Sequence, residues 1–171
     1  MIGILEGIGY GVYRRDQASP MSLSGQQIDK IAKAIHQDYR KNNPGSRCDM
    51  PWEGLPWEIK QSNLNQAISF AQHLEMLGLK CVPDGDAGQA IDQLTDEQLE
   101  RVSERVHDVW VKSKIEMGWA LGPSYDECNK LHPLLVGWDK LPPEEKKKDS
   151  DIAKSIIPLL QDSGLRVHRQ L

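Results

Sequence analysis

Two stretches of the chain align with each other without a gap, at a separation of 86 positions. Residues 52–82 read WEGLPWEIKQSNLNQAISFAQHLEMLGLKCV, and residues 138–168 read WDKLPPEEKKKDSDIAKSIIPLLQDSGLRVH. The matching residues form an opening turn, lie on a helix and end that helix at a glycine: Trp52/Trp138, Leu55/Leu141, Pro56/Pro142, Ala67/Ala153, Leu74/Leu160 and Gly78/Gly164. A glycine directly after a helix favours a left-handed cap. This repeat restricts the fold most, because both copies must form the same turn, helix and short strand.

A second match lies upstream, where IAKAIHQDY at residues 31–39 resembles VSERVHDVW at residues 102–110, now 71 positions apart. The second copy therefore carries 15 extra residues in the loop that follows this helix. Two matches in the same order indicate an internal duplication, and duplicated halves usually pack about a pseudo-two-fold axis.

We therefore predict one mainly helical α+β domain at residues 24–171. It consists of two pseudo-two-fold-related helix-loop-helix-strand repeats, at 24–83 and 89–170, with short antiparallel strands. A Gly-rich N-terminal arm at residues 1–23 precedes this domain.

Capping signals place the helix ends. Ser24-x-x-Gln27 and Thr95-x-x-Gln98 are capping boxes at the start of the first and third helices. Pro158 falls inside the fourth helical pattern and removes a backbone donor there, so we expect a kink or an early break near Ile157.

Charge and cysteine content exclude several classes of function. The 171 residues carry a formal net charge of -4, which argues against binding a phosphate backbone as the main role. Cys48, Cys81 and Cys128 lie far apart, so we expect neither a zinc ribbon nor a disulfide framework. The apolar start of the chain lacks the basic leader of a secretory signal and is too short to span a bilayer. We expect a cytoplasmic protein without a cofactor, a nucleic-acid partner or a membrane anchor.

Two histidine-aromatic pairs are the first candidate site. His36 and Tyr39 lie three residues apart on the first helix, and His107 and Trp110 lie three apart on the third. Residues at this spacing project from one helix face, so a two-fold would let the pairs face each other across a cleft. The alternative is that these are satisfied structural histidines beside core aromatics.

The loop GWALGPSYDECNKLHP, residues 118–133, is the second candidate. It sets Trp119, Tyr125 and His132 among glycines and prolines, and long loops of this kind often carry function. Its alternative role is a lid whose aromatic side chains cover the core.

Signatures of catalysis are missing from the sequence. It contains no HExxH, no GxSxG and no phosphate-binding loop with its Lys-Ser/Thr. His36, His107 and His132 could converge on a metal, but no two of them sit four apart on one helix, so we predict no metal site.

Several motifs resemble the RyR domain, the tandem repeat of ryanodine receptors that also occurs in free-standing bacterial proteins. They are IHQDY, PWEGLP, VHDVW, Lys114-x-x-x-Gly118-Trp119, Gly122-Pro123, KLHPLLVGWDKLP, the region of Asp149 and IIPLL-x-x-x-GLRV, and they span residues 28–169. The chain departs from the family at three positions, where Tyr39 replaces Trp, Leu64 replaces Arg and Leu121 replaces Tyr.

The resemblance implies a pseudo-symmetric helical fold without known catalytic activity and with an adenine-nucleotide site between the halves. Carried onto this sequence, Trp110 and Tyr39 would form aromatic walls, flanked by His36 and His107. We further predict that residues 118–133 form one wall of the cleft, with Trp119 and His132 as ligand candidates. The cations expected to reach a phosphate are Lys114 and Lys130.

Three hypotheses of function follow. The first is a non-catalytic module that binds ATP or another adenine-derived signal in the aromatic cleft. The second is a structural or protein-interaction module that uses the same cleft for a protein partner. The third is a nucleotide-processing enzyme with His107 or His132 as general base, for which the sequence offers no nucleophile.

Overall fold

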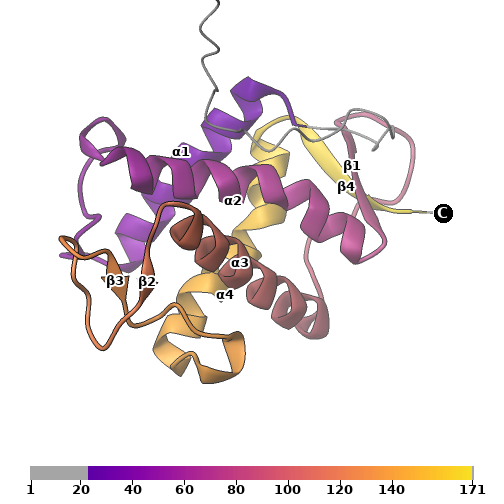
Figure 1. The fold of residues 1–171 in the computed structure, drawn as a ribbon. Helices are drawn as coiled ribbons and strands as arrows, with labels where there is room; N and C mark the ends of the chain where they lie inside the picture. Colours follow the sequence, from indigo (N-terminus) through magenta and orange to yellow (C-terminus); the bar gives the residue numbers. More distant parts are fainter. Residues whose placement is uncertain (1–22, 171) are drawn as a thin grey trace, which may run out of the picture.

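The computed structural model describes residues 23–170. The predicted arm at residues 1–23 lies outside this range, apart from Leu23. The first half of the chain contains α1 (Gly25–Asn42), the 3-10 turn η1 (Trp52–Gly54), α2 (Trp57–Met76) and β1 (Leu79–Pro83). The second contains α3 (Asp96–Glu116), β2 (Ala120–Leu121), β3 (Leu131–His132), η2 (Trp138–Lys140), α4 (Pro143–Asp162) and β4 (Leu165–Arg169) (Figure 1). The chain is mainly helical, as predicted.

Both capping boxes form. The Ser24 hydroxyl accepts a hydrogen bond from the Gln27 amide at 3.2 Å, and the Gln27 side chain accepts one from the Ser24 amide at 2.9 Å. Thr95 and Gln98 make the same two bonds at 3.2 and 3.0 Å. Each box satisfies two amides that a helix start leaves without partners, which fixes where α1 and α3 begin.

The helices α2 and α4 end as the repeat predicts. Gly78 and Gly164 follow them with φ of 68° and 80°, in the left-handed region that favours glycine. Of the kink or early break expected near Ile157, the break is wrong, because α4 continues through Pro158 to Asp162, and the kink stays a prediction. Pro158 lies on the exposed face, while the next two residues, Leu159 and Leu160, are buried, and their burial holds the last turn in place.

The core lies between the four helices and beneath the β1–β4 ribbon. α1 packs against α2, α2 against α3, and α3 against α4. The largest core side chains on α2 and α4 are Phe70, Leu74, Ile156 and Leu160, each with an exposed fraction of 0%. These four are two pairs related by the 86-residue separation, so the repeat places equivalent residues in one core.

The strands β1 and β4 pair antiparallel and join the two halves. Cys81 lies opposite Val167, and these two residues are themselves 86 positions apart. Beyond the strands, the Asp84 amide donates to the Gly164 carbonyl at 3.0 Å, and the Gln170 amide donates to the Gly78 carbonyl at 2.8 Å. A two-fold through the Cys81–Val167 pair would give this register. The register supports the pseudo-two-fold, which stays a prediction.

The long loop contains a pairing that the sequence did not predict. β2 and β3 form a two-stranded sheet that is parallel, not antiparallel, with Ala120 beside Leu131. The backbones approach so closely that a Cβ on Gly122 would lie 2.6 Å from the Leu131 Cβ. Trp119 is 5% exposed, so part of this loop does cover the interior. Among residues 23–170, every helix is too short or too polar to cross a membrane.

Candidate functional site

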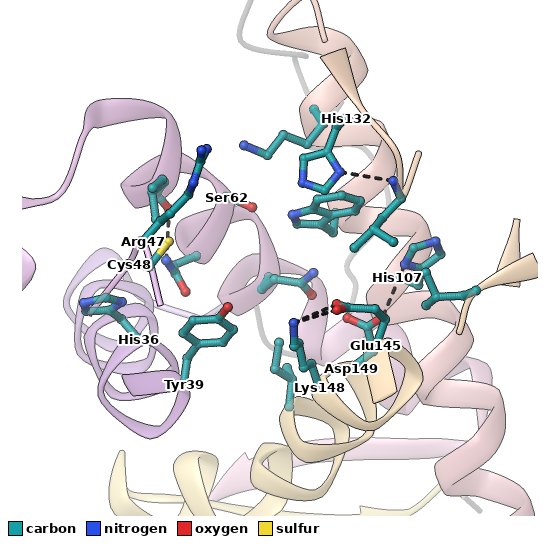
Figure 2. A pocket seen from close by; sticks show the side chains of 18 of the residues that line it. His36, Tyr39, Arg47, Cys48, Ser62, His107, His132, Glu145, Lys148 and Asp149 are labelled. Carbon is teal, nitrogen blue, oxygen red and sulfur yellow. Dashed lines mark hydrogen bonds and ion pairs between the residues drawn. The ribbon is translucent and has the colours of Figure 1, made fainter. Parts of the chain in front are cut away.

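A cavity of about 330 Å³ opens between the two halves (Figure 2). α1 contributes His36 and Tyr39 to its lining, and α3 contributes His107, Trp110 and Lys114. Figure 2 shows His36 and Tyr39 on the side opposite His107 and His132. A cavity of this size falls within the range of small-molecule sites.

Eight further lining residues come from equivalent positions on α2 and α4. The four pairs, each 86 positions apart, are Ile59/Glu145, Ser62/Lys148, Asn63/Asp149 and Gln66/Ile152. At these paired positions α2 therefore supplies uncharged side chains to the cavity, whereas α4 supplies three ionisable ones.

His36 and His107 have matching structural contacts. The Nε2 atom of His36 donates to the Met50 carbonyl at 2.8 Å, and that of His107 donates to the Val136 carbonyl at 2.8 Å. Each imidazole also lies 6.1 Å from the Trp that opens the following turn, Trp52 or Trp138, measured between ring centroids. Both side chains are buried. The structural alternative thus holds for both histidines, which fasten the turns and also line the cavity.

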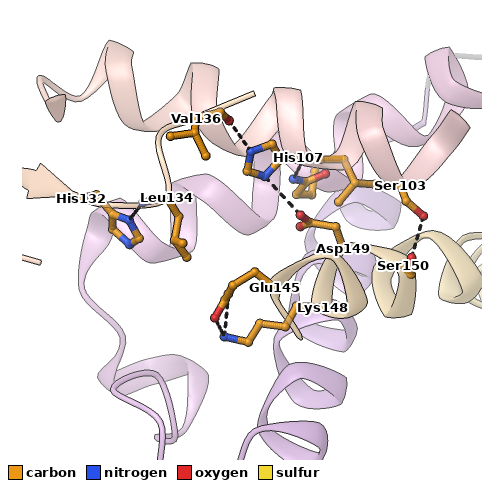
Figure 3. A network of polar contacts seen from close by, with 11 residues as sticks. Ser103, His107, His132, Leu134, Val136, Glu145, Lys148, Asp149 and Ser150 are labelled. Atoms are coloured by element: carbon orange, nitrogen blue, oxygen red, sulfur yellow. Dashed lines mark hydrogen bonds and ion pairs between the residues drawn. The ribbon is translucent and has the colours of Figure 1, made fainter. Parts of the chain in front are cut away.

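His107 has a second partner that His36 lacks. Its Nδ1 lies 3.2 Å from the Asp149 Oδ2 (Figure 3). Burial lowers the pKa of His107, but the bonds to Asp149 and Val136 outweigh it, so that this pKa lies above 6.5. Burial raises the pKa of Asp149 above 3.8, against the opposing effect of His107. Because Nε2 donates to the Val136 carbonyl, the hydrogen bond between Nδ1 and Oδ2 requires a proton on one of these two atoms.

His132 also lines the cavity, but its pKa is shifted in the opposite direction from that of His107. Its Nδ1 accepts a hydrogen bond from the Leu134 amide at 3.2 Å, which leaves Nε2 to carry the proton. Burial, followed by the positive charge of Lys114, lowers the pKa of His132 below 6.5. At neutral pH it is an uncharged ring whose centroid lies 4.9 Å from that of Trp110, edge to face.

The aromatic walls are Trp110 and Tyr39. Trp110 is half-buried and held by two imidazoles, stacked on His107 with ring centroids 5.8 Å apart and edge to face with His132. Tyr39 lies on the facing side, and burial raises the pKa of its hydroxyl above 10.0, so this hydroxyl is neutral. Contacts on two sides orient Trp110, so its ring is a preformed surface for a flat ligand.

Two cations give the cavity a positive end. The Lys114 side chain is 9% exposed, and its ammonium lies 4.7 Å from the centre of the Trp119 ring. The Arg47 guanidinium lies 3.6 Å from the centre of the Tyr125 ring. Within residues 23–170, neither cation forms an ion pair. Burial lowers the pKa of Lys114 below 10.5, the effect expected of an ammonium that lacks a carboxylate at contact distance.

Trp119 and Lys130 do not line the cavity. Both bind Glu58, Trp119 through Nε1 at 2.9 Å and Lys130 through Nζ at 2.8 Å, and Lys130 also donates to the Met117 carbonyl at 2.8 Å. The hydrogen bonds from Lys130 and Trp119 lower the pKa of Glu58 below 4.5. These contacts fasten the long loop to the start of α2, and a ligand role for either residue stays a prediction.

Six of the eight predicted ligand residues line the cavity, and so does Tyr125 of the candidate loop. The sequence analysis assigned no ligand role to five other ionisable residues that line it: Arg47, Cys48, Glu145, Lys148 and Asp149. The Glu145 carboxylate accepts two hydrogen bonds from the Lys148 ammonium, both at 2.8 Å, so this pair is internally neutralised. The 86-residue alignment could have flagged Asp149, since it pairs this carboxylate with Asn63. Of the three departures from the family pattern, Tyr39 lines the cavity, whereas Leu64 and Leu121 do not.

The cavity offers an aromatic ring, cations and a carboxylate as binding groups. Across residues 23–170, no group of three or more His, Cys, Asp and Glu side chains is placed to hold a metal ion. The family comparison concerns the second half, which supplies His107, Trp110, Lys114, His132 and Asp149. Residues 88–169 match the family model of the RyR domain, in agreement with the resemblance that the sequence motifs show.

Proposed function

We propose that the chain is a non-catalytic module that binds an adenine nucleotide, or a signal derived from one, in the cavity between its halves. One observation carries the proposal. The cavity combines a preformed aromatic surface, Trp110, with two cations, Lys114 and Arg47, that have no carboxylate partner in the part of the chain that the structure describes.

Each part of a nucleotide has a counterpart in this arrangement. A base stacked on an aromatic side chain gains about 1–3 kcal/mol in comparable nucleic-acid sites. A phosphate would give Lys114 and Arg47 the anion they lack, and an ion pair inside a cavity is screened less by salt than one at the surface. Stacking orients the ligand, and the cations select for negative charge.

The test is a panel of ATP, ADP, AMP, adenosine, GTP, cyclic nucleotides and ADP-ribose, measured by thermal shift and titration calorimetry. A ligand at a hundred times its dissociation constant stabilises the folded state by about 2.7 kcal/mol, a readily measured shift. We expect adenine nucleotides to stabilise the wild type and Trp110→Phe, and Trp110→Ala to lose the effect.

The matched control is Trp57→Ala, because Trp57 lies at the start of α2 with 64% of its surface exposed and does not line the cavity. This variant should bind as the wild type does. Equal binding by a folded Trp110→Ala would contradict the location of the site. If no nucleotide stabilises the wild type, the protein-interaction alternative replaces this proposal.

A further inference from the structure

We infer that Asp149 recognises a hydrogen-bond donor on the ligand and so fixes which way round the ligand lies in the cavity. The inference rests on the proposed function and adds a second contact on the side of the cavity remote from Arg47. The donor would be a ribose hydroxyl or the exocyclic amine of an adenine nucleotide, since both groups can donate a hydrogen bond to a carboxylate.

One of the two oxygens of the Asp149 carboxylate has a hydrogen-bond partner among residues 23–170. Its Oδ2 bonds to the Nδ1 of His107, whereas Oδ1 has no hydrogen bond or ion pair with any of residues 23–170. The side chain is 15% exposed and belongs to the cavity lining. A donor on the ligand would give this acceptor, which faces little solvent, a hydrogen-bond partner in place of water.

The neighbours of Asp149 hold this carboxylate in one orientation. His107 is anchored at its other nitrogen by the Val136 carbonyl, so its Nδ1 can face only towards Asp149. Ser103 lies one turn before His107 on α3, and Ser150 directly follows Asp149 on α4; their hydroxyls lie 3.1 Å apart and tie the two helices together beside the pair (Figure 3). An acceptor held in this way loses little freedom when a ligand binds.

The two ends of the cavity would then allow the ligand to bind in only one orientation. Figure 2 shows Arg47 on the side remote from Asp149. A ligand with a phosphate at Arg47 and Lys114 presents its base or ribose towards Asp149. The equivalent position in the first half is Asn63, whose amide nitrogen donates to the Ile59 carbonyl at 2.9 Å, so the reversed orientation meets no free carboxylate.

The experiment compares four probes by titration calorimetry. AMP is the fragment common to ATP, ADP and ADP-ribose. 2′-Deoxy-AMP and 3′-deoxy-AMP each lack one ribose hydroxyl, and IMP replaces the amine with a carbonyl. We expect the wild type to bind at least one of the three analogues about tenfold or more weakly than AMP, the size of a hydrogen bond to a charged group.

Asp149→Asn is the diagnostic variant, because its amide can donate to the neutral Nδ1 of His107 and keep the helices joined. We expect it to bind AMP more weakly and to cut the discrimination to about threefold or less, as for a neutral hydrogen bond. Asp149→Ala should remove the discrimination altogether. Asp151→Asn is the matched control, since Asp151 pairs with Lys147 at 2.6 Å and does not line the cavity.

The outcomes separate this inference from the proposed function. If the wild type binds AMP and Asp149→Asn keeps the same analogue ratios, the assignment of Asp149 is overturned and the nucleotide site stands. If the wild type binds AMP and none of the analogues is discriminated, the assignment is likewise overturned. If neither AMP nor ATP binds the wild type, both conclusions fall together.

Discussion

Replacing Lys114 with Met should make the protein more stable and weaken its hold on anions. Lys114 is 9% exposed and has an aromatic ring but no anion beside its ammonium. Methionine keeps most of the aliphatic stem against its neighbours and removes the charge. The two effects have opposite signs, which distinguishes a ligand-binding cation from one that serves the fold.

The size of the stability gain follows from burial. Taking an ammonium out of water costs several kcal/mol even after the protein relaxes around it, and a cation-aromatic contact returns about 0.5–2 kcal/mol. We expect Lys114→Met to raise the free energy of unfolding by about 1–3 kcal/mol. In a domain of this length each kcal/mol raises Tm by about 2–4 °C.

The assay is urea denaturation of wild type, Lys114→Met and Lys112→Met, with nucleotide titration of each. Lys112 lies on the same helix with 77% of its side chain exposed, so its replacement should change stability by less than about 0.5 kcal/mol. A Lys114→Met variant destabilised by more than about 1 kcal/mol would refute the reasoning, because it would mean that the ammonium serves the fold.

The pH dependence supplies an independent check on Lys114. Because burial lowers its folded-state pKa below 10.5, the unfolded chain binds the extra proton between the two pKa values. Wild-type stability therefore rises relative to Lys114→Met as the pH approaches 10.5. A difference between the two proteins that stays constant with pH would contradict this account.

Two further predictions concern groups outside the cavity. Glu58→Ala should lower the free energy of unfolding by about 1–2 kcal/mol, since Trp119 and Lys130 lose a shared acceptor. The pKa of Glu58 lies below 4.5, so the loss should be full above pH 4.5 and shrink as the pH falls through the folded-state pKa in acid denaturation curves. For His73, burial lowers the pKa to about 4, so the wild type should lose stability between pH 6.5 and about 4 as the unfolded chain takes up the proton. His73→Leu, which copies the equivalent Leu159, should remove that slope in urea titrations at pH 5 and 7, and an unchanged slope would show that His73 is not its source.

The sequence predicted the parts of the fold that depend on local patterns and on the repeat. Caps at Ser24 and Thr95 and left-handed glycines at 78 and 164 are read from neighbouring residues, and the structure confirms them. The early break at Pro158 was wrong because burial of the following leucines outweighs one missing hydrogen bond.

Long-range partners were harder to predict than helix ends. Lys130 was expected near a phosphate, but its ammonium reaches Glu58, 72 positions away. Asp149 lines the cavity because of the face that α4 turns towards it, and Arg47 because of the path of the loop between α1 and η1. No short sequence motif encodes either of these. The histidine-aromatic pairs were placed because one helix turn sets their direction and the repeat brings the two helices together.

The β1–β4 ribbon bears on how a chain of this kind could diversify. A lone half would leave its strand edge open and carry one wall of a cavity, and the register about Cys81 and Val167 is one that two identical copies could share. Such an assembly would have identical walls, so every substitution would appear twice. Fusion into one polypeptide removes that restriction. In one polypeptide Asn63 can stay neutral while Asp149, 86 positions further on, is acidic, so the two ends of the site can differ.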